Sequence, residues 1–328
     1  MATAAQTPGI PDPSQHDFVA PSGAPGQRLD QALAALLPQH SRTRLKGWIE
    51  AGQVAVDGTI IVEPRFRIRG GEVIAVVEGA QAAALPDLPE DIAINVVFED
   101  EVLLVIDKPA GLVVHPGSGN HAGTLLNALL HRVPELAMVP RAGIVHRLDK
   151  DTSGLMVVAR TAIAQTDLVR QLAARTVKRE YLAVVHGDLA RATTIDAPIG
   201  RHPALRTSMA VVTAGKPART HVDVIERFGM ATLLRCRLET GRTHQIRVHL
   251  TAIGNPLVGD PTYRAVRGRT PALPAAALGF GRQALHAQRL GLVHPGTGAA
   301  MEWTSAPPAD LAALVVTLRA ARTPPVAV

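Results

Sequence analysis

The sequence predicts an α+β protein in which a small N-terminal α/β domain precedes a larger domain, built on a mixed, mainly antiparallel β-sheet with flanking helices. Two observations lead to this prediction. Residues 81–92, within "GAQAAALPDLPEDI", have the composition of a linker between two regions. After them, short apolar runs typical of strands follow one another without regular alternation with helices, which argues against a doubly wound parallel sheet. At 328 residues the chain is long enough for both domains.

Residues 26–80 have the pattern of a short helix pair followed by a β-hairpin. Residues 1–25 show no helical or strand periodicity and are predicted to be a flexible tail. The predicted elements are, in order, a helix that begins at Leu29 and ends at Pro38, a helix capped by Ser41 and followed by Gly52, a strand over 53–56, and a return strand over 60–62. Asp57-Gly58 between the two strands is typical of a tight turn.

Basic residues gather in this small domain. Between residues 41 and 70 there are six Lys or Arg residues and three Asp or Glu residues. Arg42, Arg44 and Lys46 lie on the second predicted helix, and we expect them to contact RNA. The alternative is a solvated helix face without a ligand. The segment "RLDQALAALLPQHSRTRLKGWIEAGQVAVDG" is similar to the S4 RNA-binding module in order, spacing and sign of charge, which favours binding.

Residues 93–323 are predicted to form the larger domain, with a short C-terminal tail over 324–328. The predicted strands cover 96–98, 102–106, 112–114, 155–159, 181–185, 222–227 and 231–238. The predicted helices cover 124–132, 163–174, 243–253 and 309–321. The first two strands flank Glu99-Asp100-Glu101, so we expect them to form a hairpin.

Composition excludes several classes of protein. Cys236 is the single cysteine, so neither an internal disulfide nor a cysteine-ligated zinc site can form. No apolar run approaches the roughly 20 residues that cross a bilayer, and residues 1–21 lack the pattern of a secretory signal, so we expect a cytoplasmic protein without membrane contact. The formal net charge of +6 fits a partner with phosphates, although a GC-rich genome that favours arginine explains it equally well.

A glycine-rich segment could suggest nucleotide binding. Residues 117–122 ("GSGNHA") match the dinucleotide pattern and precede a predicted helix. However, Pro116 stands where a strand should lead into the turn, and no repeated βαβ unit with an acidic residue follows. We therefore interpret this segment as a flexible loop that could face RNA, and keep a nucleotide-dependent enzyme such as an RNA methyltransferase as an alternative.

The most informative segment is 141–160, "RAGIVHRLDKDTSGLMVVAR", which places "HRLDKD" in a polar loop before an apolar strand. An aspartate among basic residues is expected to stay ionised, which suits a nucleophile or a base better than a proton donor. Asp151 precedes Thr-Ser-Gly, and its side chain can stabilise that turn. Asp149 has no such structural explanation, and the alternative for it is a charged surface loop.

The segment "HRLDKDTSG" resembles the active-site motif of RluA-type pseudouridine synthases. The resemblance implies the fold of that family and an essential carboxylate at Asp149. It also implies that Arg147 helps to hold the target uridine out of its helix. Asp149 could then attack C1′ of the ribose or assist removal of a 2′ proton, and the sequence does not decide between these routes.

Two further segments are similar to the family in the required order. "KREYLAVVHG" (178–187) carries Tyr181 at the position of the family's active-site tyrosine. The alternative interpretation of Tyr181 is a half-buried core residue on a strand. "LETGRTHQIRVHL" (238–250) carries Arg247, which the resemblance implies pairs with the catalytic aspartate. Arg242 and His244 in this segment are expected to contact RNA. His244 and His249 are five residues apart without a further ligand, so no metal site is expected.

The similarity extends from about residue 27 to about residue 319, through "VVHPGSGN", "IGRHP", "NPLVGDPTY", "RQALHA" and "MEW". The S4-like front end and "VVHPGSGN" most resemble the RluD-type subfamily, which acts on large-subunit ribosomal RNA. The resemblance implies isomerisation of uridine to pseudouridine in structured RNA. This reaction involves no oxidation and no incoming group, so we expect no cofactor, and we expect a monomer. Its partner would be ribosomal RNA or a ribosome assembly intermediate. The remaining alternative is a non-catalytic RNA-binding or ribosome-assembly factor.

Overall fold

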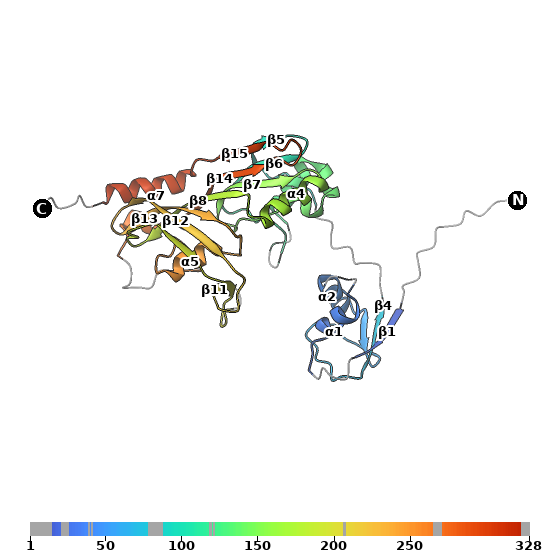
Figure 1. Cartoon of the computed structure of the whole chain (residues 1–328). Coiled ribbons are helices and arrows are strands. Elements are labelled where there is room, and N and C mark those ends of the chain that lie inside the picture. Colours follow the sequence, from blue (N-terminus) through green and yellow to red (C-terminus); the bar gives the residue numbers. More distant parts are fainter. Residues whose placement is uncertain are drawn as a thin grey trace. The chain divides into compact units, whose positions relative to one another are not determined.

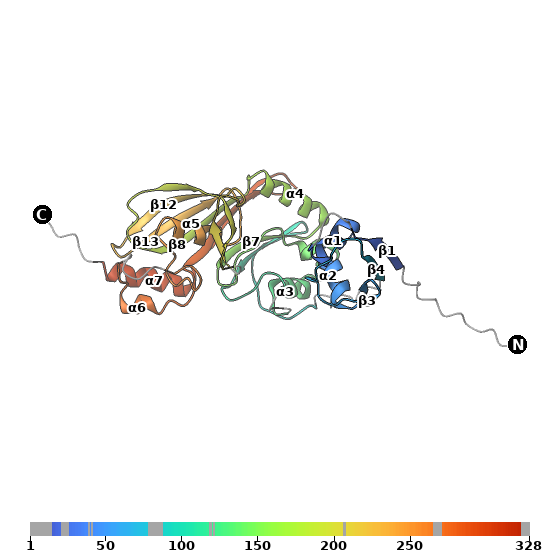
Figure 2. The same cartoon turned by 90° about the horizontal axis from the view of Figure 1, so that it is seen from below.

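The computed structural model describes residues 15–20, 26–38, 40, 42–77, 88–117, 120, 122–205, 208–264 and 271–322. The chain divides into two compact units, Met1–Pro86 and Asp87–Val328 (Figures 1 and 2). Most of the predicted linker, and the predicted C-terminal tail, lie outside the described residues. The last part of the predicted linker belongs to the larger unit, because Asn127 bonds to the backbone of both Leu88 and Glu90.

The smaller unit packs two helices on a four-stranded sheet. The helices are α1 (Leu29–Leu36) and α2 (Arg42–Glu50), and the strands, in sheet order, are β1 (Gln15–Val19), β4 (Val73–Val77), β2 (Val54–Val56) and β3 (Thr59–Ile60). Its core consists of apolar side chains from both layers, among them Leu29, Leu33, Leu45, Ile49, Val54 and Ile74. Apolar positions three to four residues apart on the helices therefore meet alternate positions on the strands.

Two predictions for this unit were wrong in part. Gln15–Val19 lies in the range predicted to be a flexible tail, but it forms β1 and pairs antiparallel with β4 along its whole length. The return strand of the hairpin ends at Ile60, two residues earlier than predicted. The first difference depends on β4, a strand that the sequence analysis did not identify and that pairs with β1 and β2 from more than 15 residues away.

The larger unit is built on a nine-stranded sheet with the order β5-β6-β7-β14-β8-β13-β12-β9, in which β15 also pairs with β14. The strands are β5 (Asn95–Glu99), β6 (Leu103–Lys108), β7 (Ser153–Ala159), β8 (Lys178–His186), β9 (Thr193–Asp196), β12 (Arg219–Arg227), β13 (Ala231–Leu238), β14 (Leu285–Val293) and β15 (Ala300–Thr304). A separate pair consists of β10 (Ile199–Arg201) and β11 (Met209–Val211). Among the described strands only β7 and β14 pair in parallel, which confirms the predicted mixed, mainly antiparallel sheet.

Helices cover both faces of this sheet (Figure 2). Along β8, Tyr181 and Ala183 belong to the core cluster that includes α3 (Leu125–Arg132) and α5 (Gln245–Ala252). Leu182 and Val184 alternate with them and pack instead with α6 (Ala275–Leu278) and α7 (Ala309–Ala320). The face with α3 and α5, which also carries the 3-10 helices η1 (Pro134–Met138) and η2 (Pro140–Gly143), is called the site face below.

The opposite face is also covered by α4 (Ala162–Ala173), whose buried Ala164 and Leu168 contact β6 and β7. The predicted hairpin 96–98/102–106 is confirmed as β5 and β6, although the predicted strand over 112–114 is not, since only Val113 makes an isolated bridge there. Within the described part of the chain, every helix is too short or too polar to cross a bilayer.

The parallel contact of β7 with β14 requires glycine at position 154. Gly154 has φ +116 and lies opposite Ala287, and a Cβ there would stand 2.3 Å from the Ala287 carbonyl oxygen. We expect Gly154→Ala to lower the free energy of unfolding by about 3 kcal/mol or more, because backbone must move. Gly298→Ala is the control, with φ +73 but open space, and should lose only about 1–2 kcal/mol. Urea unfolding measures both, and equal losses would contradict the close approach.

Candidate active site

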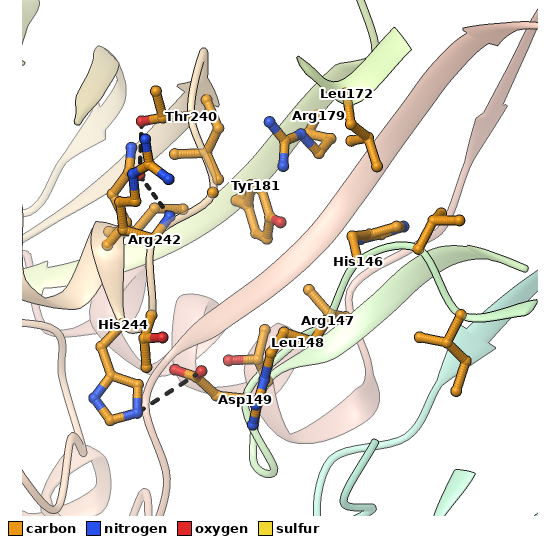
Figure 3. A pocket seen from close by; sticks show the side chains of 18 of the residues that line it. His146, Arg147, Leu148, Asp149, Leu172, Arg179, Tyr181, Thr240, Arg242 and His244 are labelled. Atoms are coloured by element: carbon orange, nitrogen blue, oxygen red, sulfur yellow. Dashed lines mark hydrogen bonds and ion pairs between the residues drawn. The ribbon is translucent and has the colours of Figure 1, made fainter. Parts of the chain in front are cut away.

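A cavity of about 940 Å³ opens on the site face (Figure 3). Three segments far apart in the sequence line it: the loop before β7, the start of β8, and the stretch 238–247 that leads into α5. A second cavity of about 490 Å³ adjoins it and shares the loop before β7 and the start of α5. Both cavities are lined by Asp149, so this carboxylate lies where they meet.

Asp149 is one of two carboxylates on a single guanidinium. Arg247 donates from Nη1 to Asp149 Oδ2 at 2.9 Å. Its Nε and Nη2 donate to the two oxygens of Asp260 at 2.7 and 2.8 Å. The side chains of Arg247 and Asp260 are 5% and 0% exposed, whereas that of Asp149 is 18% exposed. The pair with Asp260 therefore fixes Arg247 internally, and Asp149 is the member of the group that solvent or a substrate reaches.

Arg247 stays protonated in this position. Burial acts to lower its pKa, but the hydrogen bonds and negative charges of Asp260 and Asp149 together raise the pKa above the ordinary value for arginine. Asp260 is held in turn by the backbone N–H groups of Thr262 and Tyr263. The permanent cation of Arg247 donates to Asp149 Oδ2 at 2.9 Å and sets the direction of its carboxylate.

The start of α5 determines where Arg247 points. His244 precedes the helix with φ 57, a left-handed conformation that ends the preceding loop and delays the helix by two residues relative to the predicted start. Gln245, buried at the first helical position, accepts from Thr240 Oγ1 and the Arg242 N–H and donates to Arg219 O and Thr220 Oγ1. The two donated bonds attach the first turn to β12, and the two accepted bonds attach it to the loop before α5. The start of the helix is therefore fixed, and Arg247 leaves it toward the cavity.

The loop that carries Asp149 is held through its backbone. The Lys150 carbonyl accepts from the Gly111 N–H and from Lys108 Nζ, both at 2.9 Å. The Asp151 carbonyl accepts from Arg282 Nη1. Because these partners come from the end of β6 and from the segment before β14, the loop is pinned on two sides without using the Asp149 side chain.

His244 also faces the catalytic candidate. Its Nε2 lies 3.9 Å from Asp149 Oδ1, and its Nδ1 lies 2.9 Å from the Tyr263 hydroxyl. That hydroxyl already accepts from the Met209 N–H, which favours donation of its proton to His244 Nδ1. Burial lowers the pKa of His244 despite the nearby Asp149. The arrangement therefore favours a neutral imidazole whose Nε2–H points toward Asp149.

Tyr181 presents its ring to the same cavity from β8 (Figure 3). The residue is buried, and burial, together with the charge of Asp149, raises the pKa of its hydroxyl despite the opposing charge of Arg179. The phenol is therefore neutral at physiological pH. Its ring offers an apolar surface on which a base can stack.

The structure brings most of the predicted site residues together. The cavity is lined by Arg147, Asp149, Tyr181, Arg242, His244 and Arg247. Arg147 is exposed, whereas Arg242 is half-buried and donates from Nε to the Pro217 carbonyl. The small-domain candidates belong to the other unit, where Lys46 pairs with Glu50 at 3.2 Å. The side chains of Arg42 and Arg44 lie outside the description.

Three residues of this region were not predicted from sequence. Asp260 lies in the quoted segment "NPLVGDPTY", where an acidic residue between apolar neighbours and a proline was the available signal. Arg179 lies within the quoted segment "KREYLAVVHG", and Lys108 follows the predicted strand over 102–106, but a lysine or arginine gives no sign of burial in the sequence. All three are at most 9% exposed. Their roles depend on partners that only the folded chain brings near.

The described residues hold no group of three or more His, Cys, Asp or Glu side chains that could bind a metal ion. His249 is buried between Thr220 Oγ1 and the Ala197 carbonyl, at 2.9 Å each, so its ring nitrogens serve the fold. In the glycine-rich segment, Gly117 and Asn120 bond to each other through their backbones and line the second cavity. Residues 118, 119 and 121 of that segment lie outside the described residues.

Comparison with known proteins agrees with this geometry. The family model described as RNA pseudouridylate synthase matches residues 102–252, and the S4 domain model matches residues 27–74. The chain is 56% identical over 306 residues to the protein of Nitrosomonas europaea named ribosomal large subunit pseudouridine synthase D, covering 92% of this chain and 88% of that protein. The protein of the same name from Pseudomonas aeruginosa is 56% identical over 299 residues, covering 90% and 92%.

Solved structures of lower sequence identity show the same relationship. Human RNA pseudouridylate synthase domain containing 1 is 28% identical with a TM-score of 0.53, and the match covers 72% of this chain and 98% of that one. Human RNA pseudouridylate synthase domain containing 4 is 25% identical with a TM-score of 0.54, covering 69% and 93%. The similarity in structure therefore covers about 70% of this chain.

Lys108 gives a test of how the Asp149 loop is supported. Its Nζ donates to three carbonyls, of Pro109, Leu112 and Lys150, and burial lowers its pKa from 10.5 to about 8 although Asp151 and Asp149 oppose this. Between these two values the unfolded chain binds more protons than the folded chain, so the contribution of Lys108 to stability rises with pH.

We therefore expect the free energy of unfolding of the wild type, minus that of Lys108→Met, to increase from about pH 8 to about pH 10. Urea unfolding of both proteins at several pH values measures this difference. The two proteins share all other titrating groups, so the pH dependence of this difference isolates the contribution of Lys108. A difference that stays constant or falls across this range would contradict the lowered pKa.

Proposed function

The chain belongs to the RNA pseudouridylate synthase family, and we propose that it converts uridine to pseudouridine in large-subunit ribosomal RNA with Asp149 as its catalytic carboxylate. Membership confirms the resemblance found in the sequence and favours an RNA-modifying isomerase over a non-catalytic binding factor. The observation that carries the assignment of Asp149 is its position at 2.9 Å from a buried, permanently charged arginine, at the meeting point of two cavities.

The reaction cuts the N1–C1′ bond, turns the uracil, joins C5 to C1′, releases the C5 proton and protonates N1. It is an isomerisation, so no electron donor and no transferred group enters the balance. Asp149 has the reach and charge for either of two roles, attack on C1′ or removal of a 2′ proton. In both roles the carboxylate must be directed at the ribose, and the hydrogen bond from Arg247 fixes its direction.

The remaining cavity residues fit the handling of the nucleotide. A stacked uridine must leave its helix before Asp149 can reach the ribose, which costs a few kcal/mol and least in loops. The ring of Tyr181 would receive the extruded base by stacking. Arg147 is exposed and lines both cavities, so it is suited to occupy the space that the base leaves or to hold the strand open.

RNA is the partner of this chain, as its S4 domain and its relatives indicate. We assign backbone contacts to Arg242 and His244 at the cavity and to Arg42, Arg44 and Lys46 of the small domain. Free ribosomal RNA and a ribosome assembly intermediate both satisfy this chemistry. We propose that the chain acts as a monomer in the cytoplasm, where the proposed substrate would be met.

Removal of the Asp149 carboxylate tests the central assignment. Asp149→Ala and Asp149→Asn should abolish pseudouridine formation, with a loss of at least about 10³-fold, because no other carboxylate on this guanidinium reaches the solvent. The measurement is the release of tritium from C5-labelled uridine in a large-subunit ribosomal RNA transcript. RNA affinity should stay near that of the wild type. Asp151→Ala, in the same loop, is the control and should keep most of the activity, and an active Asp149 variant would refute the assignment.

Deletion of residues 1–80 tests the role of the small domain. Because the two units are separate compact bodies, the shortened chain should keep its fold and its Asp149-dependent chemistry. Its affinity for ribosomal RNA should fall about tenfold or more, and the affinity should depend less steeply on salt, since cations that neutralise phosphates are lost. Filter binding at several salt concentrations and mapping of modified uridines measure these effects. Unchanged affinity and site choice would remove the small domain from RNA recognition.

A further inference from the structure

Arg179 is a buried cation without a partner. The residue is 9% exposed, its Nε is shielded from solvent without a hydrogen bond, and within the described part of the chain its guanidinium makes neither a hydrogen bond nor an ion pair. Two other arginines of similar burial, Arg247 and Arg282, are 5% and 9% exposed and each bond to a carboxylate through two nitrogens. An uncompensated buried charge is costly, so a group retained in this state points to a ligand.

Its position points to the same conclusion. Arg179 precedes Tyr181 by two residues on β8, so both side chains leave the strand on the site face, about 7 Å apart along it. Figure 3 shows Arg179 beside the ring of Tyr181, on the side away from Asp149. Gly241 lies against the guanidinium, since a Cβ there would stand 2.8 Å from Arg179 Nη1. The cation is therefore held at the wall of the cavity.

The reaction proposed above supplies the missing partner. When the N1–C1′ bond breaks, its electron pair stays with the base, and the resulting negative charge spreads over the carbonyl oxygens O2 and O4. We propose that Arg179 is a further catalytic residue, which donates hydrogen bonds to the carbonyl edge of the extruded uracil and stabilises the uracil anion while the ring turns. This inference rests on the proposed function and adds the group that binds the departing base.

Arg179 neither gains nor loses a proton in the proposed reaction. Asp149 accounts for the electron-poor C1′ by either of its two routes, and Arg179 compensates the electron-rich base. When C5 bonds to C1′, the charge of the base is consumed, and either the Asp149–C1′ bond breaks or the 2′ proton returns, according to the route. The C5 proton then passes to solvent while N1 takes up a proton, which restores the ring with no net change in atoms or charge. The guanidinium keeps its protons throughout, so it acts as a fixed donor to developing charge.

A backbone phosphate is the weaker candidate for this ligand. Phosphates of a bound strand stay near the solvent, where exposed cations such as Arg147 line the same cavity. Arg179 is buried beside the ring that would stack on the base, so the edge of a base lying on Tyr181 comes within reach of the guanidinium. A guanidinium offers only donors, which also suits the O4 of uracil and opposes the amino group of cytosine.

The test begins with Arg179→Met, which keeps the length of the side chain, and Arg179→Lys, which keeps its charge. Single-turnover tritium release from a C5-labelled ribosomal RNA transcript should fall about 10²-fold for Arg179→Met, as for loss of one preorganised donor, and less for Arg179→Lys. RNA affinity should match that of Arg319→Met, a control that removes the same charge from an exposed ion pair on α7. A wild-type rate in Arg179→Met would overturn the proposal.

Gly241→Ala gives a second approach that leaves Arg179 in place. The added methyl group would displace the end of a flexible side chain rather than backbone, so the variant should fold. Its rate should fall, and the fall should vanish in the Arg179→Met background, because both changes remove the same interaction. Rate losses that multiply in the double variant would show that the glycine acts without Arg179 and would contradict the proposal.

The leaving group itself distinguishes a catalytic from a structural role. Fluorine at C5 withdraws electrons and stabilises the uracil anion, so RNA made with 5-fluorouridine needs less help from Arg179. The rate ratio of wild type to Arg179→Met, measured as loss of 5-fluorouridine from nuclease digests, should be smaller than with uridine. An equal ratio on both RNAs overturns the role of Arg179, while an inactive wild type or an active Asp149→Ala would instead overturn the proposed function.

Discussion

The active-site geometry depends on one guanidinium that binds two carboxylates. Arg247 joins Asp260, 13 positions later in the chain, to Asp149, 98 positions earlier. One carboxylate is fully buried and holds the arginine, and the other reaches the cavity. Since breaking a buried pair leaves a charge uncompensated, the group tolerates little displacement. The position of the proposed catalytic carboxylate is therefore set by an internal ion pair rather than by the loop alone.

The sheet makes this meeting possible. The parallel pairing of β7 with β14, with Gly154 against the backbone of Ala287, places the end of the Asp149 loop beside the segment that supplies Arg282. β8 lies on the other side of β14 and carries Tyr181 on the face that α5 covers. Strands from distant parts of the chain therefore converge on one face, while the opposite face is closed by α4, α6 and α7.

Two buried arginines near this cavity differ in a way that matches the chemistry. Arg247 is paired before any substrate arrives, which suits a residue that organises a carboxylate. Arg179 has no partner among the described residues, which suits a residue whose partner is charge that appears during the reaction. Preorganised donors of this kind act where water is excluded and need no rearrangement when the charge develops. Tyr181 lies beside Arg179, and burial keeps its hydroxyl neutral by raising its pKa.

The sequence by itself determined the family, the hairpin of β5 and β6, and most helices, because these are recorded in local patterns. Through the resemblance to the family it also proposed Asp149, Tyr181 and Arg247 as site residues. It did not show β1 or β14, whose pairing partners are distant in the chain. It also placed the start of α5 too early, because the left-handed backbone of His244 delays the helix to Gln245. Asp260 and Arg179 were also missed, because burial and pairing are properties of the folded chain. Only the tertiary structure decided which charges are compensated, since that depends on contacts between segments that the sequence keeps apart.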